Sequence, residues 1–311
     1  MLVNGVWADK WQPVQSKDDH GRFIRQTSSF RNWVTKDGQA GKTGVGGFKA
    51  EKDRYHLYVA YICPWASRTL IVRELKKLTD IISVSVVEPF LSDQGWKFGS
   101  FPGSDLDNLN GFDYIHQAYT QSDKDYTGRA TVPILWDKKL QVIVNNESAD
   151  IIRMLNSAFD RLTDSDLDLV PRELESEIEQ LNEAIYLNLN NGVYQAGFAS
   201  SQLAYEEAYN KVFKQIDKIE QRLADERPFL FGNRLTESDI RLFVTLVRFD
   251  PAYYGLFKCN RNLISNMKYL NMYLNRILQL PGIKNTVNIN HIKRGYYSIK
   301  SLNPSGIYPL G

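Results

Sequence analysis

Apolar residues between positions 55 and 87 follow two different periods in succession. A short apolar run at 55–62 has the length of a buried strand, and a second such run occupies 81–87. Between them Ile71, Leu75 and Leu78 recur at helical spacing and define one apolar face. We therefore predict a β-α-β unit, in which the helical crossover favours parallel strands.

Two more runs of strand length follow at 130–136 and 141–145, with a polar turn at 137–139 between them. This spacing predicts an antiparallel hairpin. A helical pattern then opens at 146–148. Its apolar face consists of Ile151, Ile152 and Leu155. The order β-α-β followed by β-β-α is that of a thioredoxin-like domain, which we expect at residues 53–159.

From residue 171 onward the chain shows only helical periodicity. The stretch 236–239, Thr-Glu-Ser-Asp, has the pattern of a helix N-cap feeding an apolar helix. Three further apolar faces consist of Leu174, Ile178, Leu181 and Ile185, of Val212, Ile216, Ile219 and Leu223, and of Met267, Leu270, Leu274 and Ile277. We predict an all-helical domain at 171–311, so the fold class is α/β plus all-α.

Three segments follow neither period. Residues 160–170 are rich in Asp and form the expected linker. The polar segment 89–128 is long for a loop. Loops of that length are usually functional or disordered. We favour function for this one. Residues 1–52 are expected to be an irregular extension held in place by aromatic residues. These aromatic residues are Trp7, Trp11, Phe23, Phe30 and Trp33.

Composition excludes several classes of function. Hydrophobic residues make up 43% and charged residues 24%, as is ordinary for a globular protein, and a net charge of +2 without a basic stripe argues against nucleic acid. No run approaches the ~18–20 apolar residues that span a bilayer, and the N-terminus lacks a signal-peptide pattern, so we expect a cytoplasmic protein. Four scattered His residues and no His/Cys cluster predict no metal site.

Cys63 lies where the first predicted strand becomes a helix, and Pro64 suits the first helical position. Unpaired N–H groups, the positive helix end and Arg68 one turn later favour a thiolate there, and thiols in such surroundings have pKa values of roughly 3.5–7.5. Cys63 is therefore a candidate nucleophile, with a buried structural cysteine as the alternative. Ala66 stands where a C-x-x-C motif would place a second thiol, and Cys259 lacks a comparable context, so we interpret it as structural.

Motifs spread over nearly the whole chain resemble those of a known family. The sequence resembles the Xi class of glutathione transferases, the glutathionyl-hydroquinone reductases. The motifs are Gly46-Gly-Phe48, Ala50-Glu-Lys-Asp-Arg-Tyr55, Cys63-Pro-Trp-Ala66, Arg129-Ala-Thr-Val-Pro133, Asn146-Glu-Ser148, Asn191-Gly-Val-Tyr194, Val247-Arg-Phe-Asp-Pro251 and Asn303-Pro-Ser-Gly306. The resemblance implies glutathione as co-substrate, an aromatic glutathionyl-quinol substrate and a homodimer.

The resemblance also implies which residues bind glutathione. Val132, ahead of Pro133 in a bond that the resemblance suggests is cis, would pair its backbone with the cysteinyl part of the tripeptide. Glu147 would pair with the γ-glutamyl ammonium, Ser148 would bind the adjoining carboxylate, and Arg129 would offset the glycyl carboxylate. The complete set of implied glutathione-binding residues is Trp96, Arg129, Ala130, Thr131, Val132, Glu147 and Ser148.

Three tyrosines match the aromatic substrate pocket of the family: Tyr194, Tyr253 and Tyr296. The implied reaction begins when the Cys63 thiolate attacks the sulfur of a glutathionyl-hydroquinone, with Tyr194 as the best candidate to supply the proton. A second glutathione then resolves the mixed disulfide. Ser67 stands where many relatives carry His, which leaves open whether the native thiol is glutathione or γ-glutamylcysteine.

Two alternative functions stay open at the level of sequence. An Omega-like thioltransferase or dehydroascorbate reductase would share Cys63 and the glutathione site without needing the three tyrosines. A non-catalytic binding module with a transferase fold would make Cys63 incidental. A thiol pKa near the ordinary value of about 8.5 would favour that module.

Overall fold

The computed structural model describes residues 1–8 and 16–310, so Trp11 and Gly311 lie outside the described residues. The described chain divides into two compact units. The first contains residues 1–8, 27–167 and 285–295, and the second contains residues 16–26, 168–284 and 296–310. The limits 1–52, 53–159 and 171–311 expected from the sequence stay a prediction.

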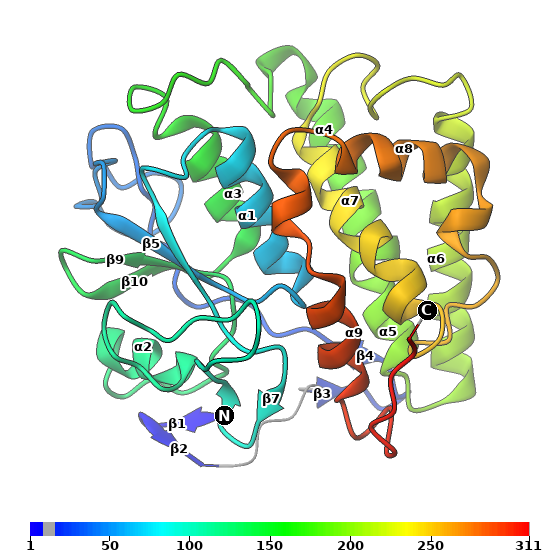
Figure 1. Cartoon of the computed structure of the whole chain (residues 1–311), viewed down its shortest axis with the longest axis horizontal. Helices are drawn as coiled ribbons and strands as arrows, with labels where there is room; N and C mark the ends of the chain where they lie inside the picture. Colours follow the sequence, from blue (N-terminus) through cyan, green and yellow to red (C-terminus); the bar gives the residue numbers. More distant parts are fainter. Residues whose placement is uncertain (9–15, 311) are drawn as a thin grey trace. The chain divides into compact units, whose positions relative to one another are not determined.

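A four-stranded sheet with the order β10-β9-β5-β6 forms the core of the first unit (Figure 1). Its strands are β5 (Tyr55–Val59), β6 (Ser83–Val86), β9 (Ile134–Asp137) and β10 (Val142–Asn145). β5 and β6 are parallel, whereas β9 is antiparallel to both β5 and β10. All residues of β5 and β9 are buried, which explains their continuous apolar runs. The predicted β-α-β unit, the hairpin and the thioredoxin-like order are confirmed.

Two helices of this unit, α1 (Pro64–Leu75) and α3 (Ser148–Ser157), pack against each other beside the sheet (Figure 1). The segment 89–128 differs from the expected loop, because it contains β7 (Leu91–Ser92), β8 (Gly95–Trp96) and α2 (Ile115–Ser122). Only three residues of α2 are buried, so its sequence shows little periodicity. This helix packs against β10.

The N-terminal segment is more regular than expected. It forms the antiparallel pairs β1 (Leu2–Val3) with β2 (Val6–Trp7) in the first unit and β3 (Ser16–Lys17) with β4 (Phe23–Ile24) in the second. Several aromatic residues nevertheless fix it in place: Phe23 and Trp33 are buried, and Trp7 stacks on His116 with 4.9 Å between ring centroids.

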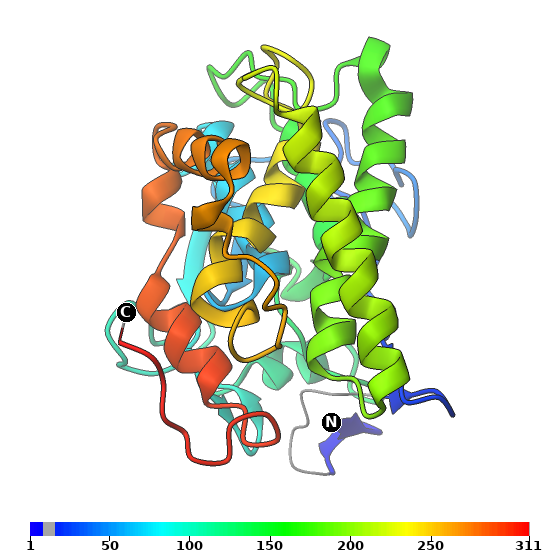
Figure 2. The ribbon, with the colours of Figure 1, turned by 90° about the vertical axis from the view of Figure 1, so that its right-hand side faces the viewer.

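The second unit is helical, as the apolar periodicity predicted (Figure 2). Its α-helices are α4 (Glu175–Ile185), α5 (Gly192–Gly197), α6 (Gln202–Arg222), α7 (Glu237–Arg248) and α8 (Lys268–Leu278), while α9 (Ile289–Tyr297) contributes residues to both units. The intervening short turns are the 3-10 helices η1 (Arg172–Leu174), η4 (Ile264–Asn266) and η5 (Ile283–Thr286) and the π-helices η2 (Tyr186–Asn190) and η3 (Phe249–Tyr253).

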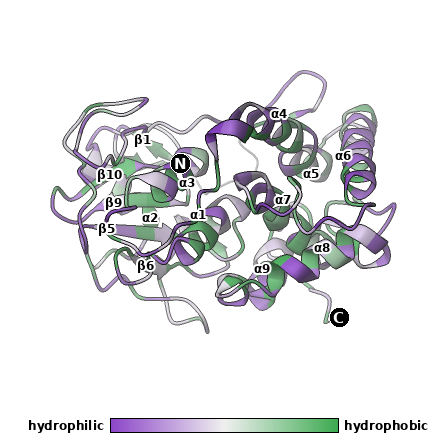
Figure 3. Cartoon of the chain, turned by 90° about the horizontal axis from the view of Figure 1, so that it is seen from above, coloured by the Kyte–Doolittle hydropathy of each residue, from purple (hydrophilic) through white to green (hydrophobic). Residues whose placement is uncertain are grey.

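Helix α7 is the central element of this unit and packs against α4 and α8 (Figure 3). All of its residues except Arg241 are buried. Thr236 caps its N-terminus, because the Asp239 carboxylate accepts hydrogen bonds from the Thr236 N–H at 2.8 Å and from the Thr236 hydroxyl at 2.9 Å. Burial raises the pKa of Asp239. The cap predicted at 236–239 is confirmed.

Within residues 1–8 and 16–310, no helix combines the length and apolar character needed to cross a membrane. The same residues contain no cluster of three or more His, Cys, Asp or Glu side chains placed to hold a metal ion.

Candidate active site

Cys63 is the N-cap residue of α1. Its Sγ accepts a hydrogen bond from the Ala66 N–H, with 3.5 Å between sulfur and nitrogen. It donates one to the carbonyl oxygen of Val132, with 3.5 Å between sulfur and oxygen. Val132 precedes Pro133 in a cis peptide bond, as the family resemblance suggested. The half-buried thiol is therefore held between the start of a helix and the cis loop ahead of β9. Both surroundings offer polar backbone groups to the sulfur or to a ligand beside it.

The buried side chain of Arg68 connects the start of α1 to the start of α3. Arg68, which is 1% exposed, directs its Nη1 to the Ser148 hydroxyl at 3.4 Å, and its guanidinium stacks over Trp65 at 4.6 Å. Glu147 caps α3 by accepting the Ala149 N–H at 3.1 Å. The predicted γ-glutamyl site is thus joined to the helix that Cys63 caps.

Tyr119 connects the start of α3 to the loop that contains the cis peptide bond. The Tyr119 hydroxyl accepts the Thr131 N–H at 3.1 Å and the Asn146 amide at 2.9 Å, and it donates to the Thr131 carbonyl at 3.0 Å. Burial raises the pKa of Tyr119 to about 12, so its hydroxyl stays protonated at neutral pH. Tyr119 therefore fixes the residue before Val132 relative to the residue before Glu147.

The remaining predicted glutathione contacts lie in the same unit. Arg129 and Ala130 are buried, and the Arg129 carbonyl accepts the Tyr126 hydroxyl at 3.1 Å. Trp96 is buried on β8, where it pairs with Leu91 of β7. Their contact with glutathione stays a prediction.

The three predicted tyrosines meet in the second unit. The Tyr296 hydroxyl lies 2.5 Å from that of Tyr194 on α5 and 2.8 Å from that of Tyr253 on η3. Burial raises the pKa of Tyr253 and of Tyr296 well above the ordinary value, so both are neutral phenols. Tyr194 is the half-buried member. The chain of hydroxyls can store and pass on a proton.

The aromatic ring of Phe257 packs among these tyrosines. Its centroid lies 5.4 Å from that of Tyr194, 5.1 Å from that of Tyr253 and 5.5 Å from that of Tyr296. Gly197 on α5 permits this approach, since a Cβ there would lie 2.4 Å from the Phe257 ring.

Sequence reasoning missed two residues in the N-terminal segment. The Ser28 hydroxyl donates to the second carboxylate oxygen of Glu147 at 3.0 Å. Arg25 places its guanidinium 4.9 Å from the ring centroid of Tyr194 and donates through Nε to Asn191 at 2.9 Å. Neither residue belongs to a periodic pattern or a motif, so the sequence carried no local signal for either contact.

The second cysteine fits its structural interpretation. Cys259 is fully buried, and burial raises the pKa of its thiol to about 12. A thiol of this kind is unreactive at neutral pH.

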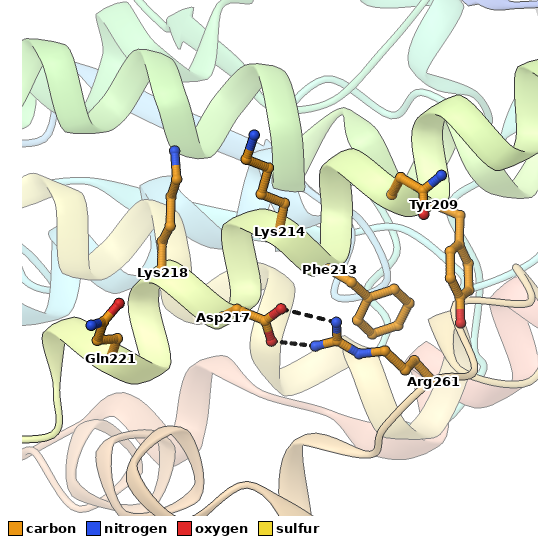
Figure 4. Close-up of a pocket in the computed structure, with 8 residues that line it drawn as sticks. Tyr209, Phe213, Lys214, Asp217, Lys218, Gln221 and Arg261 are labelled. Carbon is orange, nitrogen blue, oxygen red and sulfur yellow. Dashed lines mark hydrogen bonds and ion pairs between the residues drawn. The ribbon is translucent and has the colours of Figure 1, made fainter.

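A pocket of about 400 Å³ lies on the second unit, along α6 (Figure 4). Arg261 stacks on Phe213 at 4.5 Å and pairs with the Asp217 carboxylate. The lining charges of Lys214, Asp217 and Lys218 are exposed, so the pocket lacks the buried polar groups of an enclosed binding site. None of the predicted site residues lines it.

Comparison with known proteins identifies the class. Residues 62–158 match the N-terminal domain of glutathione S-transferases, and residues 202–276 match the C-terminal domain. The chain is 53% identical over 314 residues to the glutathionyl-hydroquinone reductase YqjG of Escherichia coli K12, covering 100% of this chain and 94% of YqjG. It is 46% identical to the glutathionyl-hydroquinone reductase PcpF of Sphingobium chlorophenolicum, covering 100% of this chain and 96% of PcpF.

Solved structures agree. The glutathione-bound structure of YqjG matches with a TM-score of 0.91 at 50% identity, covering 100% of this chain and 94% of that one. The glutathione transferase Xi of Phanerochaete chrysosporium matches with a TM-score of 0.90 at 45% identity, covering 95% and 94% of the two chains. Fold and site therefore define a glutathione transferase. Within that class, the chain belongs to the Xi class, the family of the glutathionyl-hydroquinone reductases.

Proposed function

We propose that this protein reduces glutathionyl-hydroquinones to hydroquinones with glutathione as reductant, through a mixed disulfide on Cys63. The observation that carries the proposal is the position of Cys63 at the N-cap of α1, with its sulfur against the Val132 carbonyl. Position 66 is alanine, so no second thiol of a C-x-x-C motif competes to resolve the intermediate. The resolving thiol must then come from a second glutathione.

Glutathione binds, in this proposal, along the cis loop and the start of α3. The Val132 backbone pairs with the cysteinyl residue as an added strand does, which brings the glutathione sulfur toward Cys63. Glu147 binds the γ-glutamyl ammonium. Its carboxylate is already oriented by hydrogen bonds from the Ala149 N–H and the Ser28 hydroxyl. Ser148 receives the carboxylate at the helix N-terminus, where Arg68 adds a positive charge. Arg129, Ala130, Thr131 and Trp96 complete the proposed site.

The first chemical step is attack of the Cys63 thiolate on the sulfur of the glutathionyl-hydroquinone. A new S–S bond forms, the bond between sulfur and the aromatic carbon breaks, and its electron pair passes to the quinol. The quinol takes up one proton, which Tyr194 supplies with Tyr253 and Tyr296 behind it in the chain of hydroxyls. The products are hydroquinone and the Cys63–glutathione mixed disulfide.

The second step regenerates the enzyme. A glutathione thiolate attacks the glutathione sulfur of the mixed disulfide, which releases oxidised glutathione and returns Cys63 as a thiolate. The balance is one glutathionyl-hydroquinone and one glutathione consumed for one hydroquinone and one oxidised glutathione formed. Two electrons pass from the thiols to the aromatic substrate.

We also infer a cytoplasmic location and a homodimer. The reaction consumes reduced glutathione, which the cytosol maintains. The dimer rests on the family resemblance, and sedimentation of the purified protein tests it directly.

The test of the proposed activity is turnover of a glutathionylated hydroquinone compared with dehydroascorbate. We expect reduction of the quinol substrate to exceed that of dehydroascorbate. Cys63→Ala should abolish quinol reduction, whereas Cys259→Ala should retain it. Turnover that survives Cys63→Ala would refute the thiolate mechanism, and a preference for dehydroascorbate would favour the Omega-like activity instead.

A further inference from the structure

We propose that Arg25 is a positioning residue for Tyr194, whose guanidinium holds the phenol ring and stabilises the tyrosinate formed when Tyr194 gives its proton to the leaving quinol. This inference deepens the proposed function and rests on it for the identity of the proton acceptor. The contact between Arg25 and Tyr194 lies within the second unit.

Neighbouring groups of that unit hold the Arg25 guanidinium in place. Its carbon lies 4.9 Å from the ring centroid of Tyr194 and 5.3 Å from that of Phe23. Its Nε donates to the Asn191 side chain at 2.9 Å, three residues before Tyr194. A cation over an aromatic face is attracted by the ring, and the attraction grows when the ring acquires a full negative charge.

The backbone that carries Arg25 is itself anchored to the helices. The carbonyl of Gly21 accepts the Ser200 N–H at 3.1 Å, and the carbonyl of His20 accepts the Ser201 hydroxyl at 2.7 Å. Arg22 pairs with both carboxylate oxygens of Glu207 on α6 at 2.8 and 2.9 Å. The guanidinium of Arg25 is therefore placed before substrate arrives, which avoids an entropic cost at the reaction step.

Exposure indicates which tyrosine can reach a substrate. Tyr253 is 0% and Tyr296 2% exposed, whereas Tyr194 is half-buried. In the proposed function, Tyr194 is therefore the proton donor. The Tyr296 hydroxyl lies 2.5 Å from that of Tyr194 and can donate to the oxygen that becomes negative.

Arg248 and Arg25 both act on this cluster of tyrosines. Arg248, buried at the end of α7, lowers the pKa of Tyr253 and of Tyr296 against the larger raising effect of burial. Arg25 comes from the N-terminal segment, and its guanidinium lies over the ring of Tyr194. The negative charge left after proton transfer is thus met by the Tyr296 hydroxyl and by the guanidinium of Arg25.

The variants that test this role are Arg25→Gln, Arg25→Lys and the matched control Lys17→Gln. Lys17 lies in the same segment and loses the same charge on replacement, but its side chain is exposed on β3. The first readout needs no substrate: ultraviolet titration of tyrosinate, taken as the difference between each protein and its own Tyr194→Phe partner. We expect Arg25→Gln to raise the ionisation midpoint of Tyr194 by about one pH unit, whereas Lys17→Gln leaves it unchanged.

The second readout is the dependence of kcat on the leaving group. With an unsubstituted hydroquinone, Arg25→Gln should lower kcat about tenfold and Arg25→Lys by less, because lysine keeps the charge. With a chlorinated hydroquinone, which needs less help from an acid, the loss should shrink to about twofold.

The outcomes separate the two proposals. If the wild-type protein reduces no glutathionyl-hydroquinone, the proposed function fails while the titration still tests the role of Arg25. If the wild type is active and Arg25→Gln matches Lys17→Gln in both readouts, the role of Arg25 is refuted. A loss of kcat that is equal for all leaving groups would also refute it, because that result reports general damage to the site.

Discussion

Replacing Tyr119 by phenylalanine removes one oxygen atom and with it the link between the two segments proposed to bind glutathione. The hydroxyl satisfies the Asn146 amide, which is buried, and the Thr131 N–H, which belongs to a half-buried residue. A buried donor left unpaired costs about 1–3 kcal/mol, and water can reach the second donor in part. We therefore expect Tyr119→Phe to lower the free energy of unfolding by about 2–4 kcal/mol.

The same change should weaken glutathione binding, because the residue before Val132 loses its fixed position. We expect the Kd for glutathione to rise about five- to tenfold, or about 1–1.4 kcal/mol. Calorimetry in a Cys63→Ala background measures this Kd without turnover, and denaturation in urea measures stability.

The matched control is Tyr273→Phe in the second unit. Tyr273 is equally buried and donates to the Asp239 carboxylate at 2.8 Å, so its replacement also destabilises the protein. It should leave the Kd for glutathione unchanged. The reasoning is refuted if Tyr119→Phe loses stability as expected but binds glutathione as tightly as the parent protein.

Three further predictions concern charge and pH. Glu147→Gln should raise the Kd for glutathione at least about tenfold in calorimetry, since the γ-glutamyl ammonium loses its counter-charge; an unchanged Kd would remove Glu147 from the site. Burial lowers the pKa of His56 to about 3, so below the unfolded pKa of about 6.5 only the unfolded chain binds this proton. Stability should then fall on acidification through that window by about 1.4 kcal/mol per pH unit, and denaturation at a series of pH values should show a shallower slope for His56→Asn. A slow thiol reagent near neutral pH should label Cys63 and spare Cys259, whose pKa burial raises to about 12; equal labelling in peptide mass spectra would contradict both assignments.

The fold was predictable where apolar periods are long and strong. The fully buried strands β5 and β9 produce continuous apolar runs, and the apolar face of α6 holds its period over 21 residues. Helix α2 escaped prediction because only Ile115, Ala118 and Tyr119 of its residues are buried. The strands of the N-terminal segment have two residues each, which is too short for any period to show.

The site was predictable in its local parts. The change from strand to helix at Cys63 is visible in neighbouring residues, and so is the helix start at Glu147 and Ser148. The supporting contacts join distant residues: Ser28 and Glu147 are 119 positions apart, and Arg25 and Asn191 are 166 apart. Such pairings depend on the folded chain and leave no signature in either segment alone, so only the structure reveals them.

The most direct test of the proposed mechanism is to trap the mixed disulfide between Cys63 and glutathione. The protein is mixed with one equivalent of a glutathionyl-hydroquinone in the absence of free glutathione, and its peptides are analysed by mass spectrometry without reductant. We predict one glutathione on Cys63, none on Cys259, and release of one equivalent of hydroquinone, with oxidised glutathione appearing only when glutathione is added. Release of hydroquinone with no glutathione bound to Cys63 would contradict the mixed-disulfide mechanism.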